Sequence, residues 1–325
     1  MLARLLLSVS VLVASAAWRQ AGPGGPAGEP DAANSIAATV NGVPLFAAQV
    51  ERLVQLSVGD RKVTDEARRQ LQAEALEQLV KQQLVLAHLE RQGEAASLQD
   101  VEFAVGQLIN QLARQERTLD EYLRARGLNE QSLRQALRWQ LSWKEYLAKQ
   151  LTEENVQRHF AKHRAQFDGT RLRVAQILLK IPAAPDGREK ALRRATNIRD
   201  DIVSGRLSFA DAARRHSDSP SASAGGELGW ITRREPMPES FSAAAFQLEQ
   251  GTVSEPLVSP FGVHLIQCLE TQPGRATWED VREDVEAAMA SHLFDWASSR
   301  PDQEAEIRYT GAVPHFRPGT REVAQ

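Results

Sequence analysis

The sequence predicts an α+β protein, in which a helical module carries one inserted α/β domain with a small sheet flanked by helices. Residues 35–168 are rich in polar residues and carry apolar residues at helical spacing. Strand patterns alternate with helices between 169 and 272, which is typical of a small α/β domain. A further amphipathic helix at 277–299 has an apolar stripe that needs a partner.

Length and composition agree with this division. The chain has 325 residues, which at about 150 residues per domain predicts two domains. It has 39 basic and 42 acidic residues, a net charge of −3, so we expect no nucleic-acid partner. The single cysteine, Cys268, excludes an internal disulfide and a cysteine-based zinc site.

The N-terminus has the pattern of a signal peptide at residues 1–16. Arg4 is followed by an apolar run at 5–13 and by small residues at 14–16 that fit a cleavage site. An N-terminal membrane anchor is less favoured, because the run is shorter than the roughly 20 residues of a spanning helix. We therefore expect export to the periplasm or cell envelope and no integral membrane span after cleavage. Residues 17–34, rich in Gly, Pro and Ala, are predicted to be a linker.

Capping residues divide the region 35–168 into separate helices. The predicted caps are Thr64, Ser97 with Asp100, Thr118 with Glu121, and Thr152. Gly93 and Gly127 are suited to ending helices. Residues 40–44 have the pattern of a short strand and turn. The region is predicted to be a helical module for binding or assembly.

The α/β domain is predicted at 169–272, with two strands and three helices as its recognisable elements. The strands are at 171–180 and 263–270, and the helices at 186–204, after Ser208 and near 239–247. Residues 273–309 should pack back on the helical module, because a small sheet already has its own covering helices. Within them, 304–309 is predicted to be a closing strand, and 310–325 a frayed tail.

Motifs in a fixed order run through residues 170–271. They are Phe209-Ala210, Ser217-Asp218-Ser219-Pro220, Gly225-Gly226-Glu227-Leu228-Gly229-Trp230, Met237 with Phe241, Ala245-Phe246, Gly251 with Val253, Pro256-Leu257 and Phe261-Gly262-Val263-His264. This region resembles the parvulin-type peptidyl-prolyl isomerases. The flanking helices resemble the chaperone module of exported SurA- and PrsA-like foldases, on Val40-Asn41-Gly42 and Leu79-Val80 with Leu84-Val85-Leu86.

The resemblance implies a proline pocket and a polar network. Four positions match the pocket, with the last as a supporting wall: Leu228, Met237, Phe241 and Phe246. His264 matches the histidine of the last strand, which belongs to the hydrogen-bond network. Without the surrounding motifs, plain core packing would be the preferred explanation for Met237 and Phe241, and an ordinary strand histidine for His264.

Two positions depart from the family pattern. Gln176 stands where the family has a histidine in its first strand, and Ser219 where it has Cys or Asp. Gln176 offers a donor and an acceptor and can pair with His264, but it cannot titrate. Asp218 is not expected to take the role of Ser219, because the side chains of neighbouring residues point in opposite directions there. We therefore expect a good pocket, a weakened polar network and slow catalysis.

The predicted function is peptidyl-prolyl isomerisation and folding of unfolded or proline-containing exported polypeptides, with no cofactor and no metal. The alternative is a non-catalytic periplasmic holdase or assembly factor, serving an envelope or exopolysaccharide system through a degenerate site. His159 and His163 share a helix face but lack a third ligand, so they are predicted to be solvated surface rather than a metal site. The sequence does not predict the oligomeric state.

Overall fold

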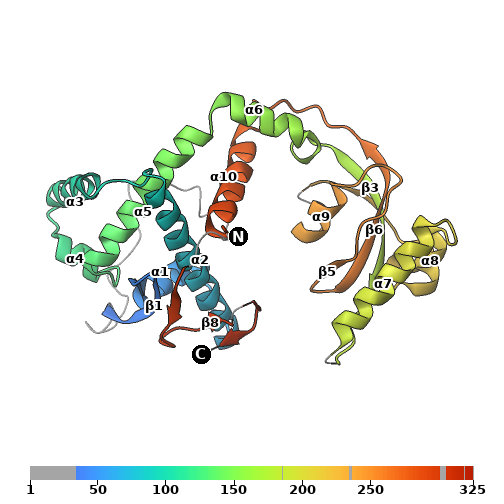
Figure 1. Cartoon of the computed structure of the whole chain (residues 1–325), viewed down its shortest axis with the longest axis horizontal. Coiled ribbons are helices and arrows are strands. Elements are labelled where there is room, and N and C mark those ends of the chain that lie inside the picture. Colours follow the sequence, from blue (N-terminus) through green and yellow to red (C-terminus); the bar gives the residue numbers. More distant parts are fainter. Residues whose placement is uncertain (1–33, 185, 234–235, 301–304, 318, 325) are drawn as a thin grey trace. The chain divides into compact units, whose positions relative to one another are not determined.

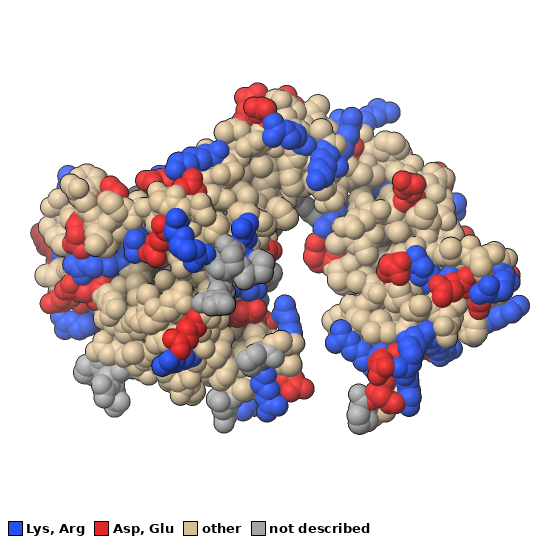
Figure 2. Space-filling view, in the orientation of Figure 1, with Lys and Arg blue, Asp and Glu red and all other residues tan. Residues whose placement is uncertain are grey.

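The computed structural model describes residues 34–184, 186–233, 236–300, 305–317 and 319–324. The predicted signal peptide and residues 17–33 of the predicted linker lie outside these ranges. The chain forms two compact units, one from the residues up to Thr152 together with those from Ala287 onward, the other from Glu153–Glu286. The sequence-based limits at 168/169 and 272/273 remain proposals. On the face shown in Figure 2, acidic and basic side chains are interspersed.

The first unit contains a three-stranded antiparallel sheet in the order β2-β1-β7. Its strands are β1 (Ile36–Val40), β2 (Val43–Phe46) and β7 (Ile307–Tyr309). Asn41 and Gly42 join β1 to β2, and both have positive φ, 51° and 79°. Because a two-residue hairpin turn of this kind needs positive φ at both positions, Asn-Gly suits it well.

Helices make up most of the first unit (Figure 1). They are α1 (Ala47–Val58), α2 (Asp65–Arg91), α3 (Leu98–Ala113), α4 (Leu119–Arg124), α5 (Glu130–Gln150) and most of α10 (Arg282–Ser298). The hydroxyls of Thr64, Ser97 and Thr118 each accept a backbone N–H of the helix that follows, as predicted. Local sequence alone therefore fixes where these three helices begin.

The C-terminal half of α10 packs into the first unit. Ala290, Phe294 and Ala297 are buried against α2 and α5, whose contributing residues are Val85, Leu89, Trp143, Tyr146 and Leu147. Trp139 and Trp143 stack with centroids 5.4 Å apart, and Phe294 meets both rings edge-on. This aromatic cluster buries the apolar stripe of α10.

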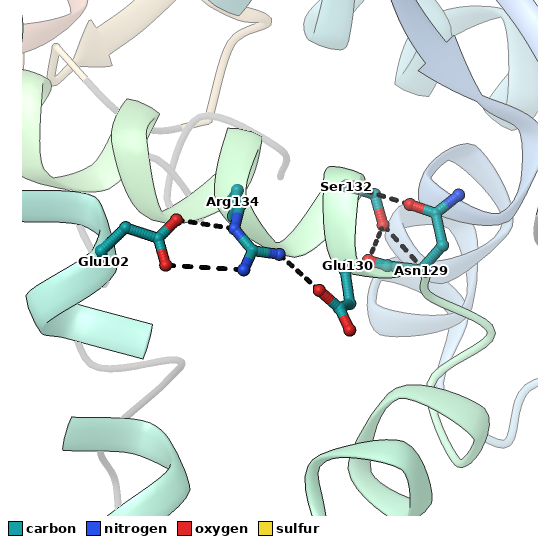
Figure 3. Close-up of polar contacts among 5 residues, drawn as sticks. All are labelled: Glu102, Asn129, Glu130, Ser132 and Arg134. Atoms are coloured by element: carbon teal, nitrogen blue, oxygen red, sulfur yellow. Dashed lines mark hydrogen bonds and ion pairs between the residues drawn. The ribbon is translucent and has the colours of Figure 1, made fainter. Parts of the chain in front are cut away.

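α3 is held on α5 by an apolar core and an ion-pair bridge. Figure 3 shows Arg134 of α5 between the carboxylates of Glu102 of α3 and Glu130, each 2.7 Å from a guanidinium nitrogen. The hydrogen bonds that Arg134 donates to both carboxylates raise the pKa of its guanidinium group. Because all three side chains are largely exposed, we expect about 0–1 kcal/mol from such pairs. The side of α3 that faces α5 is therefore set mainly by its buried apolar residues Val101, Val105 and Leu112.

The prediction of a frayed tail at 310–325 is wrong for the described residues. β8 (His315–Phe316) pairs with β9 (Val323–Ala324), and Val313 is buried in the core formed by β1, α1 and α2. Tyr309 stacks on His315 with centroids 4.3 Å apart. The sequence did not reveal this hairpin because its strands have two residues each, too few for a recognisable period.

The second unit is built on a four-stranded sheet in the order β4-β3-β6-β5. The strands are β3 (Arg171–Leu179), β4 (Glu227–Ile231), β5 (Leu257–Ser259) and β6 (Gly262–Gln272), and the helices α6 (Glu153–Lys162), α7 (Gly187–Val203), α8 (Phe209–His216) and α9 (Glu239–Ala245). All strand pairs are antiparallel although helices intervene along the sequence.

The two faces of this sheet are covered by different helices. Ile177 and Leu265 lie on the face that packs against α7 and α8. Val174 and Ile266 lie on the other face, where α9 contributes Phe241. Because side chains alternate along a strand, Gln176 and His264 share the α9 face with Val174 and Ile266.

Buried hydrogen bonds join the segments that lead into β3 and out of β6. The carboxylate of Asp168 accepts from the N–H and the hydroxyl of Thr170 at 2.9 and 2.5 Å. That hydroxyl accepts from the N–H of Gly274 at 3.0 Å, and the carbonyl of Asp168 accepts from Ala276 at 3.0 Å. A Cβ on Gly274 would lie 1.9 Å from the Asp168 carbonyl, so the two segments meet only because this residue is glycine.

Candidate functional site

Gln176 and His264 meet in the middle of the sheet, on neighbouring strands. Both are buried, and Nδ1 of His264 lies 3.1 Å from Oε1 of Gln176. Burial lowers the pKa of His264, so the imidazole is neutral at pH 7. Because an amide oxygen only accepts, Nδ1 carries the proton and Nε2 is left as an acceptor. The predicted pairing of these two residues is present.

The contact extends into a chain of hydrogen bonds, which we call the polar network. Oγ of Ser259 lies 2.6 Å from Nε2 of His264, and Nε2 of Gln176 donates to Oγ of Ser219 at 3.1 Å. The Ser219 hydroxyl lies 3.0 Å from that of Ser221. None of these five side chains carries a charge when His264 is neutral. The polar network therefore consists of uncharged groups, in which the hydrogen bonds from Ser259 through His264 and Gln176 to Ser219 are donated in one direction.

The segment around Ser219 is fastened to the end of β3. The N–H of Asp218 donates to the carbonyl of Leu178 at 2.7 Å, and the Asp218 carboxylate accepts from the N–H of Lys180 at 2.9 Å. The hydroxyl of Ser217 accepts from the N–H of Leu178 at 3.0 Å. Asp218 thus bonds to the backbone of β3 and of Lys180, whereas the Ser219 side chain belongs to the polar network. This agrees with the expectation that neighbouring side chains point in opposite directions here.

Close backbone approach places β4 beside Gln176. The N–H of Gln176 donates to the carbonyl of Gly226 at 2.8 Å. Gly226 has φ of +86°, and a Cβ there would lie 2.4 Å from the Gln176 carbonyl oxygen. Only glycine fits such a position, so Gly226 helps to fix where Gln176 lies in the sheet.

The predicted pocket residues divide into two interior and two surface positions. Phe241 is only 1% exposed, and Phe246 is also buried. The ring of Phe241 meets that of His264 edge-on, with centroids 5.7 Å apart. Leu228 and Met237 are half-buried and pack against the same cluster. Phe241 therefore supports His264 from the interior, while Leu228 and Met237 are partly exposed apolar residues on the cluster that contains Phe241.

Comparison with known families matches both parts of the chain. Residues 177–270 match the PPIC-type PPIASE domain, and residues 2–147 match the SurA-like N-terminal domain. The chain combines a SurA-like N-terminal domain with a PPIC-type PPIase domain.

Relatives that share this similarity bear the name Chaperone SurA. The protein from Cupriavidus metallidurans is 48% identical over 95 residues, which are 29% of this chain and 18% of the relative. That from Albidiferax ferrireducens is 39% identical over 129 residues, 39% of this chain and 28% of the relative. The chain thus covers less than a third of either relative. The solved peptidylprolyl isomerase PrsA from Bacillus cereus is 20% identical over 82% of this chain and 90% of its own, with a TM-score of 0.32.

Ser259 and Ser221 of the PPIase domain were missed from the sequence. Ser259 reaches His264 because β5 and β6 form a tight hairpin, in which Ser259 pairs with Gly262 and Leu257 with His264. The N–H of Phe261 also donates to the Ser259 hydroxyl at 3.0 Å. The available signal for Ser259 was its place three residues before Gly262 and five before His264. It was not recognised because β5 has only three residues, too few to show the pattern of a strand.

His159 and His163 are half-buried rather than solvated. Their ring centroids lie 4.6 Å apart, and His159 also meets Phe167 at 6.0 Å. Within the described ranges, no three His, Cys, Asp or Glu side chains gather in a way that could hold a metal ion.

The arrangement of the candidate site is chemically compatible with rotation of an X-Pro bond. The barrier to this rotation is about 18–20 kcal/mol, because resonance keeps the amide planar. Rotation needs neither a nucleophile nor a metal; it needs a site that binds the twisted amide better than the planar one. An apolar surface beside a neutral, fixed set of dipoles meets that need.

Proposed function

We propose that this chain is a peptidyl-prolyl cis-trans isomerase and folding chaperone, acting on unfolded, proline-containing polypeptides outside the cytoplasm. The observation that carries the proposal is the buried contact of Gln176 with His264, edge-on to Phe241. The two matched domains and the relatives named Chaperone SurA support it. The exported location rests on the predicted signal peptide at 1–16. No helix among the described residues is long and apolar enough to cross a membrane.

In the proposed mechanism, the proline ring of the substrate lies against Leu228 and Met237, with Phe241 and Phe246 as the interior wall. A planar amide is strongly polar, and twisting removes the resonance that makes it so. A site with little water therefore favours the twisted amide over the planar one. The residues do not react; they exclude water and hold the reacting bond.

His264, Gln176 and Ser219 are the proposed catalytic residues. Their dipoles are fixed before the substrate binds, so no reorganisation is needed as the amide nitrogen becomes more basic. Gln176 holds His264 in one tautomer, and Ser219 holds Gln176 in one orientation. The resemblance places a histidine at position 176 and Cys or Asp at position 219. Because Gln176 and Ser219 are uncharged there, we expect slow turnover.

That lack of charge also favours a second candidate, a non-catalytic holdase that uses the same apolar surface. Two assays on the full chain separate the two functions. Magnetisation exchange on Xaa-Pro peptides measures isomerisation, and light scattering of a denatured client measures protection from aggregation. For the isomerase, His264→Ala should lose turnover and keep protection. A wild type with protection but without measurable turnover would establish the holdase instead.

A further inference from the structure

The segment between β4 and α9 carries Met237, one of the two partly exposed residues of the proposed pocket, between two prolines. Pro236 precedes it and Pro238 follows it. A proline ring fixes its own φ and restricts the residue before it to extended conformations. Pro238 is itself extended, with φ of −55° and ψ of 150°. The side chain of Met237 is flexible, but the backbone that carries it has little freedom.

Both ends of this segment are anchored in the apolar cluster that contains Phe241. The N–H groups of Phe241 and Ser242 each donate to the carbonyl of Pro238 at 3.0 Å. Phe241 is buried in the cluster against which Met237 packs. At the other end, Ile231 is the last residue of β4 and is buried in the same cluster.

Arg233 bridges the segment through a paired contact with Glu239, the first residue of α9. Nη1 and Nη2 of Arg233 lie 2.7 and 2.6 Å from the two carboxylate oxygens. The side chain of Arg233 is 21% exposed, although that of Glu239 is 76% exposed. The hydrogen bonds from Arg233 lower the pKa of the Glu239 carboxyl, so it is ionised at pH 7. Because a planar guanidinium matches a carboxylate at two points, the contact fixes direction as well as distance.

We propose that Arg233 is a positioning residue of the proline pocket, which through Glu239 holds Met237 in place before the substrate binds. This inference rests on the proposed function, because it assigns Met237 to the pocket. Both terminal nitrogens of Arg233 already contact Glu239, which favours positioning over direct binding of an acidic substrate residue. A pocket that is formed in advance need not be ordered by the substrate, so the ion pair should act on affinity rather than on bond rotation.

Peptide binding and turnover measure this effect. In Arg233→Gln, a smaller fraction of the molecules has Met237 in place, and the apparent dissociation constant rises by the inverse of that fraction. We expect the dissociation constant and KM for an Xaa-Pro peptide to rise about fivefold, with kcat within about twofold of wild type. The reason is that saturating peptide selects the same bound arrangement, and Gln176 and His264 lie on other elements. Arg233→Lys keeps the charge without the two-point contact, so its affinity should lie between the two.

The environment of Met237 can be followed directly. After residue 1, the methionines of the chain are Met237 and Met289. In protein labelled with carbon-13 in the methionine methyl groups, peptide should shift the Met237 signal of wild type. Arg233→Gln should shift that signal in the free protein. Met289 is buried in the first unit, and its signal should not change.

An ion pair elsewhere in the same unit supplies the matched control. Arg193 pairs with Glu189 on α7, so Arg193→Gln also removes one ion pair. It should leave the Met237 signal and the peptide affinity unchanged. Exchange of the two charges, Arg233→Glu with Glu239→Arg, should recover most of the affinity that either single change loses.

Two results would overturn the proposal. If Arg233→Gln lowers the free energy of unfolding but leaves the peptide affinity and the Met237 signal as in wild type, the ion pair has only a structural role. If it weakens binding of a peptide with glutamate before the proline and not of the same peptide with leucine there, Arg233 binds substrate directly. A wild type that binds peptide without turnover would contradict the isomerase but not this inference, because affinity and the Met237 signal are measured without turnover.

Discussion

Nδ1 of His264 donates its hydrogen bond to the side-chain oxygen of Gln176 at 3.1 Å, inside a sheet face that α9 covers. The two residues are 88 positions apart, and the antiparallel pairing of β3 with β6 brings them together. Because the glutamine amide cannot change its charge, the protonation state of the pair depends on His264 alone.

The first prediction concerns pH. The folded-state pKa of His264 is lowered by burial from its ordinary value of 6.5. Below pH 6.5 the unfolded chain binds a proton that the folded chain does not, so stability falls as pH drops; above it this contribution is fully present. The slope cannot exceed about 1.4 kcal/mol per pH unit for one group. Urea unfolding between about pH 5 and 7.5 should show a smaller slope in His264→Gln than in wild type, and equal slopes would contradict the burial effect.

The second prediction compares two phenylalanines. Phe241→Ala should destabilise the PPIase domain by about 3–5 kcal/mol, because the side chain is fully buried. Phe261→Ala is the matched control, and it should change stability by no more than about 0.5 kcal/mol, because Phe261 is 64% exposed. Both changes in the free energy of unfolding can be measured by urea unfolding followed by tryptophan fluorescence. A cost below about 1 kcal/mol for Phe241→Ala would show that Phe241 is not a core residue.

The third prediction isolates close approach from backbone strain. Gly226 and Gly229 both have φ of +86°, but a Cβ on Gly229 would meet nothing within 4 Å. Gly229→Ala should therefore cost only the strain of a left-handed residue, about 1–2 kcal/mol. Gly226→Ala should cost clearly more, since it also displaces the carbonyl of Gln176 and weakens the hydrogen bond between β4 and β3. Equal losses in the free energy of unfolding would mean that the contact at Gln176 relaxes freely.

The fourth prediction restores the polar positions of the resemblance. Gln176→His combined with Ser219→Asp should raise isomerase turnover more than it raises peptide affinity. The reason is that the apolar surface is kept while the network gains charged and titratable groups. Turnover is measured by magnetisation exchange and affinity by peptide titration. Without a gain in turnover, the two departures are not what limits catalysis.

Local features of the fold were predictable, because the signal and the structure lie within a few residues. Thr64, Ser97 and Thr118 cap their helices as predicted, since each cap involves a backbone N–H three residues away. The pairing of Gln176 with His264 was expected from the resemblance, which places both residues in one hydrogen-bond network, and strand alternation puts them on the same face of the sheet.

Features that depend on distant packing were not predictable. The residues 310–325 look like a tail in sequence, and Val313 is buried only because β1, α1 and α2 form a core around it. Ser259 joins the network through a hairpin strand of three residues, too short to show a period. From sequence alone, Phe241 could be pocket or core; its nearly complete burial and its edge-on contact with His264 depend on packing that the sequence pattern does not show.

The hydrogen bonds of Asp168 with Thr170 and Ala276 keep the start and the end of the sheet domain side by side. The roughly one hundred residues between these segments therefore form a loop whose two ends are adjacent. The entropic cost of closing such a loop rises only slowly with its length, so the length of this loop has little effect on the folding of the rest of the chain. A change in the length of this intervening segment should therefore alter the free energy of bringing the two flanking segments together only slightly.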